Sequence, residues 1–275
     1  MKIFLKFPSL LASSSILVIS GSHEAGESNL SPEVINLEGK TCSRLPEKYP
    51  KNVISAQGAF INDQVVICGG WVREPYENVE ECYTLKKGST SWTLLGNLNS
   101  INSGSSSVVL NNKLYVIGGY GNFCDDESTT IESISLDGTT TLESITVNGN
   151  LQYYGSEPDP DSLGFDPASC YGISDPASVT INSTTSITMG GNHGGFYLER
   201  TWYYNGTTFS EGPDLINGRI MGHAAGLLRD KDTNEEYIAV VGGLVVESGK
   251  WKESNFLELL KIGDNKWKSG ILFIS

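Results

Sequence analysis

Two histidines and two tyrosines are the residues whose types could support distinctive chemistry if the fold brought them together. His193 and His223 offer imidazole nitrogens and Tyr120 and Tyr197 offer phenol oxygens, a set that could hold copper. The simpler interpretation is that His223 packs against or hydrogen-bonds a loop and that His193 lies in a flexible stretch between glycine pairs. A hydrolase is not indicated, because neither a Gly-X-Ser-X-Gly motif nor a pair of carboxylates at a strand end stands out in the sequence. We therefore predict no catalytic residue and no cofactor, with the two-histidine metal site as the weaker alternative.

The cysteines and the Asn-X-Ser/Thr motifs indicate chemistry of the secretory path. The chain has five cysteines, and none of them forms the Cys-X-X-Cys or Cys-X-X-His spacing of a structural zinc site. In an exported chain such cysteines form disulfides, and an odd number leaves one thiol over. Three motifs, at Asn29, Asn182 and Asn205, are candidate sites of N-glycosylation.

The first twenty residues have the pattern of a signal peptide. Lys2 and Lys6 give a basic start, an apolar run follows from Leu10 to Ile19, and small residues surround Ser20. The run is too short to cross a bilayer of about 30 Å, so we expect cleavage near Ser20 rather than an anchor. A first strand is the weaker alternative, because residues 21–32 are polar and predict a flexible N-terminus. We expect a secreted, extracellular protein with no membrane span.

The charge of the chain excludes some partners. The formal net charge is −13, and removal of the leader with its two lysines makes it −15. Such a chain repels phosphate polymers and acidic membranes, so nucleic acid is not an expected partner. Any electrostatic partner would be a cation or a basic surface.

A repeat of about fifty residues is the strongest feature of the sequence. Four runs of strand-forming residues each end in a pair of glycines, and their first glycines are 49, 72 and 52 residues apart. The long interval contains an insertion at about 148–175, and a fixed period of this length is typical of stacked or circular repeats. The pairs are Gly69 and Gly70, Gly118 and Gly119, Gly190 and Gly191, and Gly242 and Gly243.

Each repeat has the pattern of four strands. A strand and a tight turn precede each glycine-terminated run, and the turns at Asn62-Asp63 and Asn111-Asn112 contain residues that accept the positive φ of a two-residue hairpin. A loop and a third strand follow, and then a short fourth strand, which holds Trp92 in the first unit and Trp267 in the fourth. The expected repeats cover about 53–100, 101–147, 171–215 and 219–270.

The hydrophobic strand, the Gly-Gly pair and a Trp about twenty residues later resemble the kelch repeat. The fourth unit carries most of the pattern, with Arg219-X-X-Gly222-His223-Ala224, Gly242-Gly243 and Trp267. The resemblance covers roughly residues 33–270 and implies an all-β fold, a kelch-type β-propeller whose repeats are four-stranded blades over residues 33–275. The second and third units lack the Trp.

The predicted strands do not add up to a whole number of complete blades. Residues 33–37 and 42–46 resemble the third and fourth strands of a further, partial N-terminal blade, with Cys42 in the place of the Trp. Its inner strands would come from the C-terminus, where 271–275 supply one strand at most. Since the resemblance implies five to seven blades, and an open ring would leave unpaired strand edges, we expect four complete blades and a partial one in a truncated chain.

The propeller implies two faces with different roles. Asn182 and Asn205 fall in turns on one face, so glycans there would leave the opposite face freer. That face receives the long loops at 71–78, 120–128, 192–198 and 244–254 and the insertion, and rigidly supported loops are where binding residues collect. The alternative is that their aromatic residues only pack their own loops. The candidate binding residues are Trp71, Tyr76, Tyr120, Phe123, Phe196, Tyr197 and Trp251.

The strand positions also suggest how the cysteines pair. Cys68 and Cys82 lie on neighbouring strands of one blade and could bond across it, while Cys124 and Cys170 flank the insertion and could close it. Cys42 would then remain unpaired.

These features predict a binding protein rather than an enzyme. The expected partner is an extracellular protein or glycan bound by the face with the long loops. Some secreted kelch proteins are copper oxidases that act on sugars or alcohols, and this is the alternative function, carried by His193 and His223. An intracellular adaptor fits less well, since it conflicts with the leader.

Overall fold

The computed structural model is all-β. It describes residues 4–7, 15–18, 32–36, 39–44, 48–72, 77–99, 103–119, 128–146, 173–193, 196–219, 221–247 and 250–270, and these residues contain strands and turns but no helix. No helix able to span a membrane is therefore found in this part of the chain. The chain forms two compact units, one of residues 1–116 and 131–143 and the other of residues 117–130 and 144–275.

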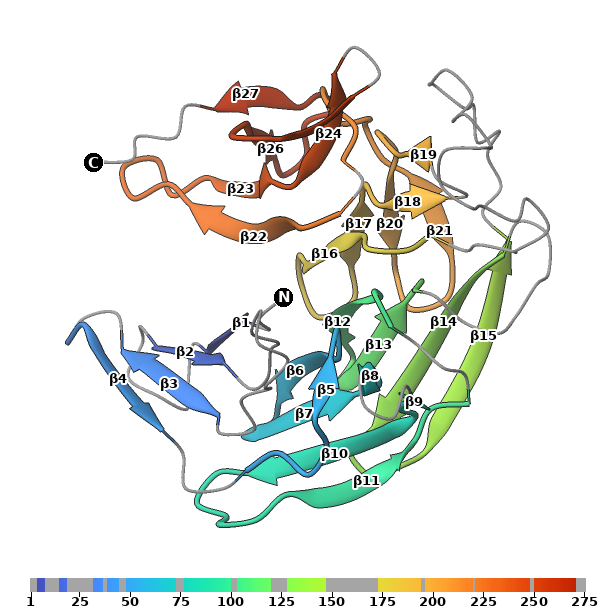
Figure 1. The fold of residues 1–275 in the computed structure, drawn as a ribbon. Helices are drawn as coiled ribbons and strands as arrows, with labels where there is room; N and C mark the ends of the chain where they lie inside the picture. Colours follow the sequence, from blue (N-terminus) through green and yellow to red (C-terminus); the bar gives the residue numbers. More distant parts are fainter. Residues whose placement is uncertain are drawn as a thin grey trace. The chain divides into compact units, whose positions relative to one another are not determined.

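The described residues form five four-stranded antiparallel sheets, each built from strands in simple sequence order (Figure 1). This order is that of the predicted blades, although Trp92 and Trp267 lie immediately before the fourth strands Thr93–Asn97 and Lys268–Gly270 rather than within them. The sheets are β1 (Phe4–Phe7), β2 (Ser15–Val18), β3 (Glu33–Asn36) and β4 (Thr41–Arg44); β6 (Gln57–Ile61), β7 (Gln64–Cys68), β10 (Glu81–Lys86) and β11 (Thr93–Asn97); β12 (Ser106–Leu110), β13 (Lys113–Ile117), β14 (Ser128–Ser135) and β15 (Thr140–Thr146); β16 (Ala177–Thr180), β17 (Ser186–Met189), β20 (Thr201–Tyr204) and β21 (Phe209–Glu211); and β22 (His223–Arg229), β23 (Glu236–Gly242), β26 (Leu257–Lys261) and β27 (Lys268–Gly270).

The turns have the backbone conformations that their residues predict. Asn62 and Asp63 have φ of 44° and 61°, and Asn111 and Asn112 have φ of 49° and 61°, as two-residue turns between twisted strands require. The glycine pair after β23 also needs its residue type. Gly243 has a φ of 87°, and a Cβ there would lie 2.8 Å from the Cβ of His223. The pair therefore lets the chain pass close to the start of β22.

The N-terminal sheet differs from the expectation. β3 and β4 are the predicted third and fourth strands, but the inner strands come from β1 and β2 and not from the C-terminus. Phe4–Phe7 and Ser15–Val18 are rich in residues that suit a strand as well as a leader, and Ile16 and Leu17 pair with Ile35 and Val34. Cleavage near Ser20 stays a prediction, and residues 21–32, predicted to be flexible, lie almost wholly outside the described residues.

Three of the expected long loops contain short β-strands. β18 (Asn192–His193) pairs with β19 (Phe196–Tyr197), and β24 (Leu244–Glu247) pairs with β25 (Lys250–Glu253). β8 (Trp71–Val72) pairs with both β9 (Glu77–Asn78) and β5 (Val53–Ile54). The expectation of irregular loops was wrong here, because Val72 and the run Leu244 to Val246 are strand formers that can pair within their own segment. Residues 120–127 and 147–172 lie outside the described residues.

The cores lie between successive sheets within each unit. In the second unit, residues of β16 and β17 pack with residues of β23 and β26 in one buried cluster that includes Trp267, which is 1% exposed. In the first unit, Val66 and Cys68 of β7 pack with Leu114 and Val116 of β13. Alternate residues of these strands face the cores, as in Ser106–Leu110, where burial alternates along the strand.

A disulfide links two strands of the second sheet. Cys68 of β7 and Cys82 of β10 are paired directly across the ladder and are bonded, as predicted. Both are buried, whereas Cys42 is an exposed free thiol. The predicted partners Cys124 and Cys170 lie outside the described residues.

Candidate functional site

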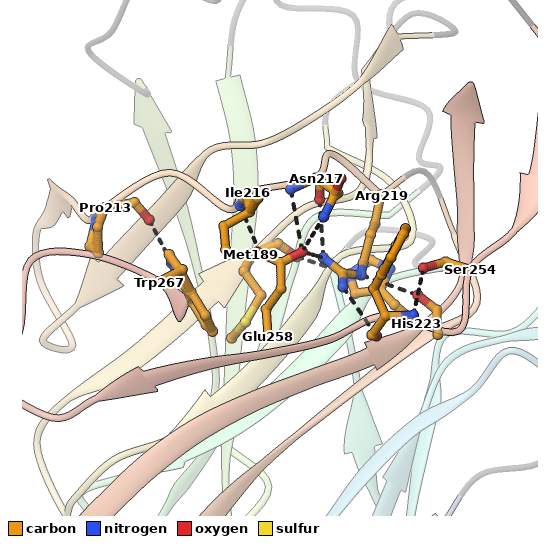
Figure 2. A network of polar contacts seen from close by, with 11 residues as sticks. Met189, Pro213, Ile216, Asn217, Arg219, His223, Ser254, Glu258 and Trp267 are labelled. Carbon is orange, nitrogen blue, oxygen red and sulfur yellow. Dashed lines mark hydrogen bonds and ion pairs between the residues drawn. The ribbon is translucent and has the colours of Figure 1, made fainter. Parts of the chain in front are cut away.

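A buried ion pair organises the end of the second unit near the last Gly-Gly pair (Figure 2). The side chains of Arg219 and Glu258 are 0% and 1% exposed, and Nη1 lies 2.5 Å from Oε1. The guanidinium also donates to the carbonyl oxygens of Asn217, Gly242 and Phe256. Charges removed from water need such additional hydrogen bonds, since desolvation otherwise outweighs their mutual attraction.

Glu258 also fixes the segment that joins the fourth sheet to the fifth. Its carboxylate accepts hydrogen bonds from the backbone N–H groups of Ile216 and Asn217, at 2.7 and 3.3 Å, and from the Asn217 side-chain amide at 3.3 Å. Glu132 of β14 has the same role in the first unit, where it is fully buried and accepts from Asn99 N–H at 2.7 Å. A buried glutamate on the third strand thus recurs as the acceptor for a connecting segment.

A pocket of about 170 Å³ opens beside this network. Its walls come from the end of β19, from the connecting segment and from the β24–β25 hairpin with the residues that follow it. The loops therefore form a concave surface on sheets that the ion pair holds together. The lining residues are Tyr197, Glu199, Ile216, Asn217, Gly218, Val245, Lys252, Glu253, Asn255 and Phe256.

The electrostatics of the pocket centre on Glu199. Burial, with the nearby charges of Asp214 and Glu258, raises the pKa of its carboxyl, although Arg200 acts in the opposite direction. Arg200 lies 3.6 Å from Asp214. No described residue forms a hydrogen bond or ion pair with the Glu199 carboxylate. This group is consequently a partly desolvated acid that favours a cation beside it.

Two large apolar residues of the pocket lining are unusually exposed to solvent. Ile216 is 46% exposed and Phe256 is 51% exposed, although both are large apolar residues. Tyr197 lies on the other side against the backbone of Gly218, where an added Cβ would come within 2.4 Å of the tyrosine Cδ2. The glycine thus leaves room for the ring beside the connecting segment.

His223 has the structural role that its position implied rather than an open metal-binding geometry. Its Nε2 lies 3.1 Å from the carbonyl oxygen of Met189, so it carries the proton and donates (Figure 2). Its Nδ1 is buried and has no hydrogen-bond partner among the described residues. Burial lowers the pKa of His223 to about 4, which keeps the ring neutral. The described residues contain no cluster of three potential metal ligands, and the side chain of His193 is outside them.

The predicted binding residues are distributed unevenly over the described part of the chain. Tyr197 lines the pocket, while Trp71 is half-buried in β8 of the first unit. Phe196 and Trp251 lie in β19 and β25, the hairpins that border the pocket, but their side chains are outside the described residues. Tyr76, Tyr120 and Phe123 are also outside them. Of the two candidates whose side chains the structure describes, one lines the pocket.

The sequence analysis did not single out Glu199 and Asn217, two polar residues of the pocket. Glu199 follows Tyr197 by two residues, and Asn217 precedes Arg219 by two. Their only sequence signal is proximity to a predicted aromatic residue and to the Arg-X-X-Gly-His pattern. That signal was too weak because the contact between the two segments depends on how one sheet packs beside the next.

The two glycosylation motifs of the described residues share one end of the fourth sheet. Asn182 is in the β16–β17 turn and Asn205 in the β20–β21 turn, while Tyr197 and Glu199 precede β20 at the other end. Both asparagines are exposed, and the hydroxyl of the motif's threonine donates to the Oδ1 of each, at 3.0 Å from Thr184 and 2.9 Å from Thr207. Asn29 lies outside the described residues.

Comparisons with known proteins agree with this fold. A family model described as the Kelch motif matches residues 102–139. The solved structure of YjhT, a kelch-type propeller protein, is similar to the chain with a TM-score of 0.64 and 13% sequence identity, over 94% of this chain and 81% of that one. Curated protein sequences give no match. The family match falls on the second of the four predicted repeats, which lacks the Trp of the repeat pattern.

Proposed function

Since the chain carries a Kelch motif and has the fold of a kelch-type β-propeller, we propose that it is an extracellular binding protein. Its partner, a protein or glycan, is held by the ends of the sheets that carry the β18–β19 and β24–β25 hairpins. The Kelch motif supports interaction as the general role, and the hairpins supply the variable surface on a rigid support.

One observation carries the proposal, namely the pocket formed by both hairpins and the connecting segment 216–218. Glu258, which is paired with Arg219, accepts a hydrogen bond from the backbone of this segment. The pocket lining therefore has a fixed shape before a partner binds. Ile216, Phe256 and Tyr197 provide apolar contact area, and the polar side chains around them provide directional contacts. This combination is typical of an interaction surface.

Three features support the extracellular location. The Cys68–Cys82 disulfide suits an oxidising compartment. Asn182 and Asn205 are exposed, and their motif hydroxyls already contact the acceptor amides. The basic and apolar pattern of residues 1–20 suits a leader. Cleavage of that leader would remove β1 and β2, so the N-terminal sequence of protein recovered from culture medium tests the two fates of this segment directly.

A glycan placed in the pocket wall tests the binding surface. Lys252→Asn creates an Asn-X-Ser motif with Ser254, and an attached glycan would cover the pocket. Wild-type and variant proteins are secreted from the same cells, glycan occupancy is measured by mass spectrometry, and each protein is used to capture partners from extracellular fluid. We expect the glycosylated variant to lose the partners that the wild type captures.

Two controls make the result specific. Enzymatic removal of the glycan from the Lys252→Asn protein should restore capture, and Thr184→Ala with Thr207→Ala, which remove the natural motifs at the other end of the sheet, should leave it unchanged. Equal capture by the fully glycosylated variant would contradict the proposal. So would bound copper together with peroxide formation from sugars or alcohols, which is the result that the oxidase alternative requires.

A further inference from the structure

We propose that the pocket between the β18–β19 and β24–β25 hairpins receives an arginine side chain from a basic segment of the protein partner. This inference rests on the proposed binding function and adds to it the chemical class of the group recognised. It follows from three properties of the lining: its hydrogen-bond acceptors, its apolar walls and its charge.

The acceptors are placed on separate elements around the pocket. Glu199 precedes β20, Glu253 ends β25, and Asn217 belongs to the connecting segment. The side-chain nitrogen Nδ2 of Asn217 donates to Glu258 at 3.3 Å, which leaves the side-chain oxygen Oδ1 as an acceptor with no donor among the described residues. A guanidinium has five N–H donors in a plane and no acceptor, so it can donate in several directions at once.

The walls suit the remainder of an arginine side chain. A guanidinium stacks on aromatic faces, and its three methylene groups cover apolar surface. Tyr197 and Phe256 supply the aromatic groups, and Ile216 supplies an aliphatic one that is 46% exposed. A compact, strongly hydrated ammonium would use these walls less well than a guanidinium.

The charge of the pocket favours a cation over an anion. Glu199 and Glu253 outnumber Lys252 among the charged lining residues, and Lys252 already has an interaction within the protein. Glu258 is neutralised by Arg219, and Asp214 lies near Arg200. Burial and the charges of Asp214 and Glu258 raise the pKa of Glu199. A partner's guanidinium would supply a positive charge and charge-assisted hydrogen bonds that favour the ionised carboxylate.

Capped tripeptides provide the direct test. Each peptide is titrated into the intact protein while the protein's backbone NMR shifts are followed. The peptides are acetyl-Gly-Arg-Gly-amide and its Lys, Gln and Glu counterparts. We expect the Arg peptide to bind most tightly and to shift residues 197–199, 216–218 and 252–256. Glu199→Gln should weaken the Arg peptide about tenfold, since a charge-assisted hydrogen bond is lost. Lys252→Gln should tighten it about twofold, because a surface like charge is removed.

Asp232→Asn is the matched control, since it removes one negative charge from the exposed β22–β23 turn at the other end of the fifth sheet. It should leave the peptide's affinity unchanged, and all three variants should keep the wild-type unfolding midpoint. Equal binding of the Gln or Glu peptide, or no effect of Glu199→Gln, would overturn the inference. If the glycan at position 252 blocks partner capture but Glu199→Gln does not, the binding surface stands and the arginine pocket fails. If neither change affects capture, the binding surface fails as well.

Discussion

Arg219 and Glu258 are paired in the interior of the second unit, where both side chains are almost completely inaccessible to solvent. The pair does more than neutralise two charges. Glu258 also holds the backbone of Ile216 and Asn217, and Arg219 also holds the carbonyl oxygens of Gly242 and Phe256. The connecting segment, the last Gly-Gly pair and the start of β26 are thereby fixed to one another below the pocket.

Removal of one partner of this pair should be strongly destabilising. Glu258→Ala leaves the Arg219 charge buried and the Ile216 and Asn217 N–H groups without their acceptor, and we expect a loss of about 3–5 kcal/mol in the free energy of unfolding. Urea unfolding at neutral pH measures it. Arg219→Met combined with Glu258→Met should cost less than the sum of the two single changes, because no unpaired charge remains. Additive losses would contradict the coupling.

Substitution by phenylalanine should lower the unfolding free energy by different amounts at the two tryptophans of the repeat pattern. Trp267 Nε1 donates to the carbonyl oxygen of Pro213 at 2.8 Å, whereas the buried Trp92 Nε1 has no partner among the described residues. Trp267→Phe should therefore cost about 1 kcal/mol more in unfolding free energy than Trp92→Phe. Thermal unfolding of the two variants measures the difference. Equal losses would show that the hydrogen bond adds nothing beyond the packing of the ring.

The Cys68–Cys82 disulfide should contribute about 2–4 kcal/mol to stability, because it restricts the conformational freedom of the unfolded chain between two residues 14 positions apart. Cys68→Ala with Cys82→Ala should lower the unfolding free energy by this amount. In the native protein, mapping of alkylated residues by mass spectrometry should find Cys42 modified first, since it is exposed and Cys68 and Cys82 are buried. Alkylation of Cys68 before Cys42 under mild reduction would be inconsistent with this arrangement.

His223 should make the protein less stable in weak acid. Its pKa is about 4 in the folded state because the ring is buried, against about 6.5 in the unfolded chain. Between these values the unfolded state binds more protons, so the unfolding free energy should fall by up to about 3 kcal/mol as the pH decreases from 6.5 to 4. Urea unfolding as a function of pH, with wild type and His223→Gln, measures this.

The variant is the control, because glutamine does not titrate. His223→Gln should show a smaller decline over the same pH range, even if it is less stable at neutral pH. Parallel curves for the two proteins would mean that other groups cause the decline.

A single methyl group at Gly218 should disturb the pocket by displacing Tyr197. Gly218→Ala would place Cβ 2.4 Å from Tyr197 Cδ2 and 3.0 Å from Glu199 Cγ, so we expect the ring to move and stability to fall by about 1–3 kcal/mol. Gly226→Ala is the matched control, because a Cβ there meets no atom within 4 Å. NMR shifts of Tyr197 and urea unfolding distinguish the two variants. Wild-type behaviour of Gly218→Ala would show that the glycine is not needed for this contact.

The fold of this chain could be predicted from its sequence to a large extent. The glycine pairs, the Asn-containing turns and the alternation of apolar residues located the four strands of each main repeat. The Cys68–Cys82 pairing also followed, because two strands that are neighbours in a meander place those residues opposite each other. These features depend on local chain geometry, which short stretches of sequence encode well.

The pocket was harder to predict, because it depends on contacts between separate segments. Glu199 and Asn217 carry no motif in the sequence. They line one pocket because the connecting segment is held in place by Glu258 and by backbone hydrogen bonds to Leu198 and Glu199. The inner strands of the N-terminal sheet were assigned to the wrong end of the chain for a related reason. A short apolar segment such as Ser15–Val18 has a sequence that suits both a leader and a strand. Its pairing with β3 makes it a strand here, and that pairing cannot be read from the segment alone.

The hydrogen bonds between Glu258 and the connecting segment also determine where new chain termini can be introduced by protein engineering. Circular permutation succeeds at exposed turns whose hydrogen bonds are local. The β22–β23 turn at 230–235 meets this condition, since Asp230 caps its own turn through Asp232 and Thr233. New termini between 212 and 219 would instead separate a glutamate from the amides it holds, although that stretch resembles a natural boundary between repeats. A permuted protein should therefore begin within a blade and not between two of them.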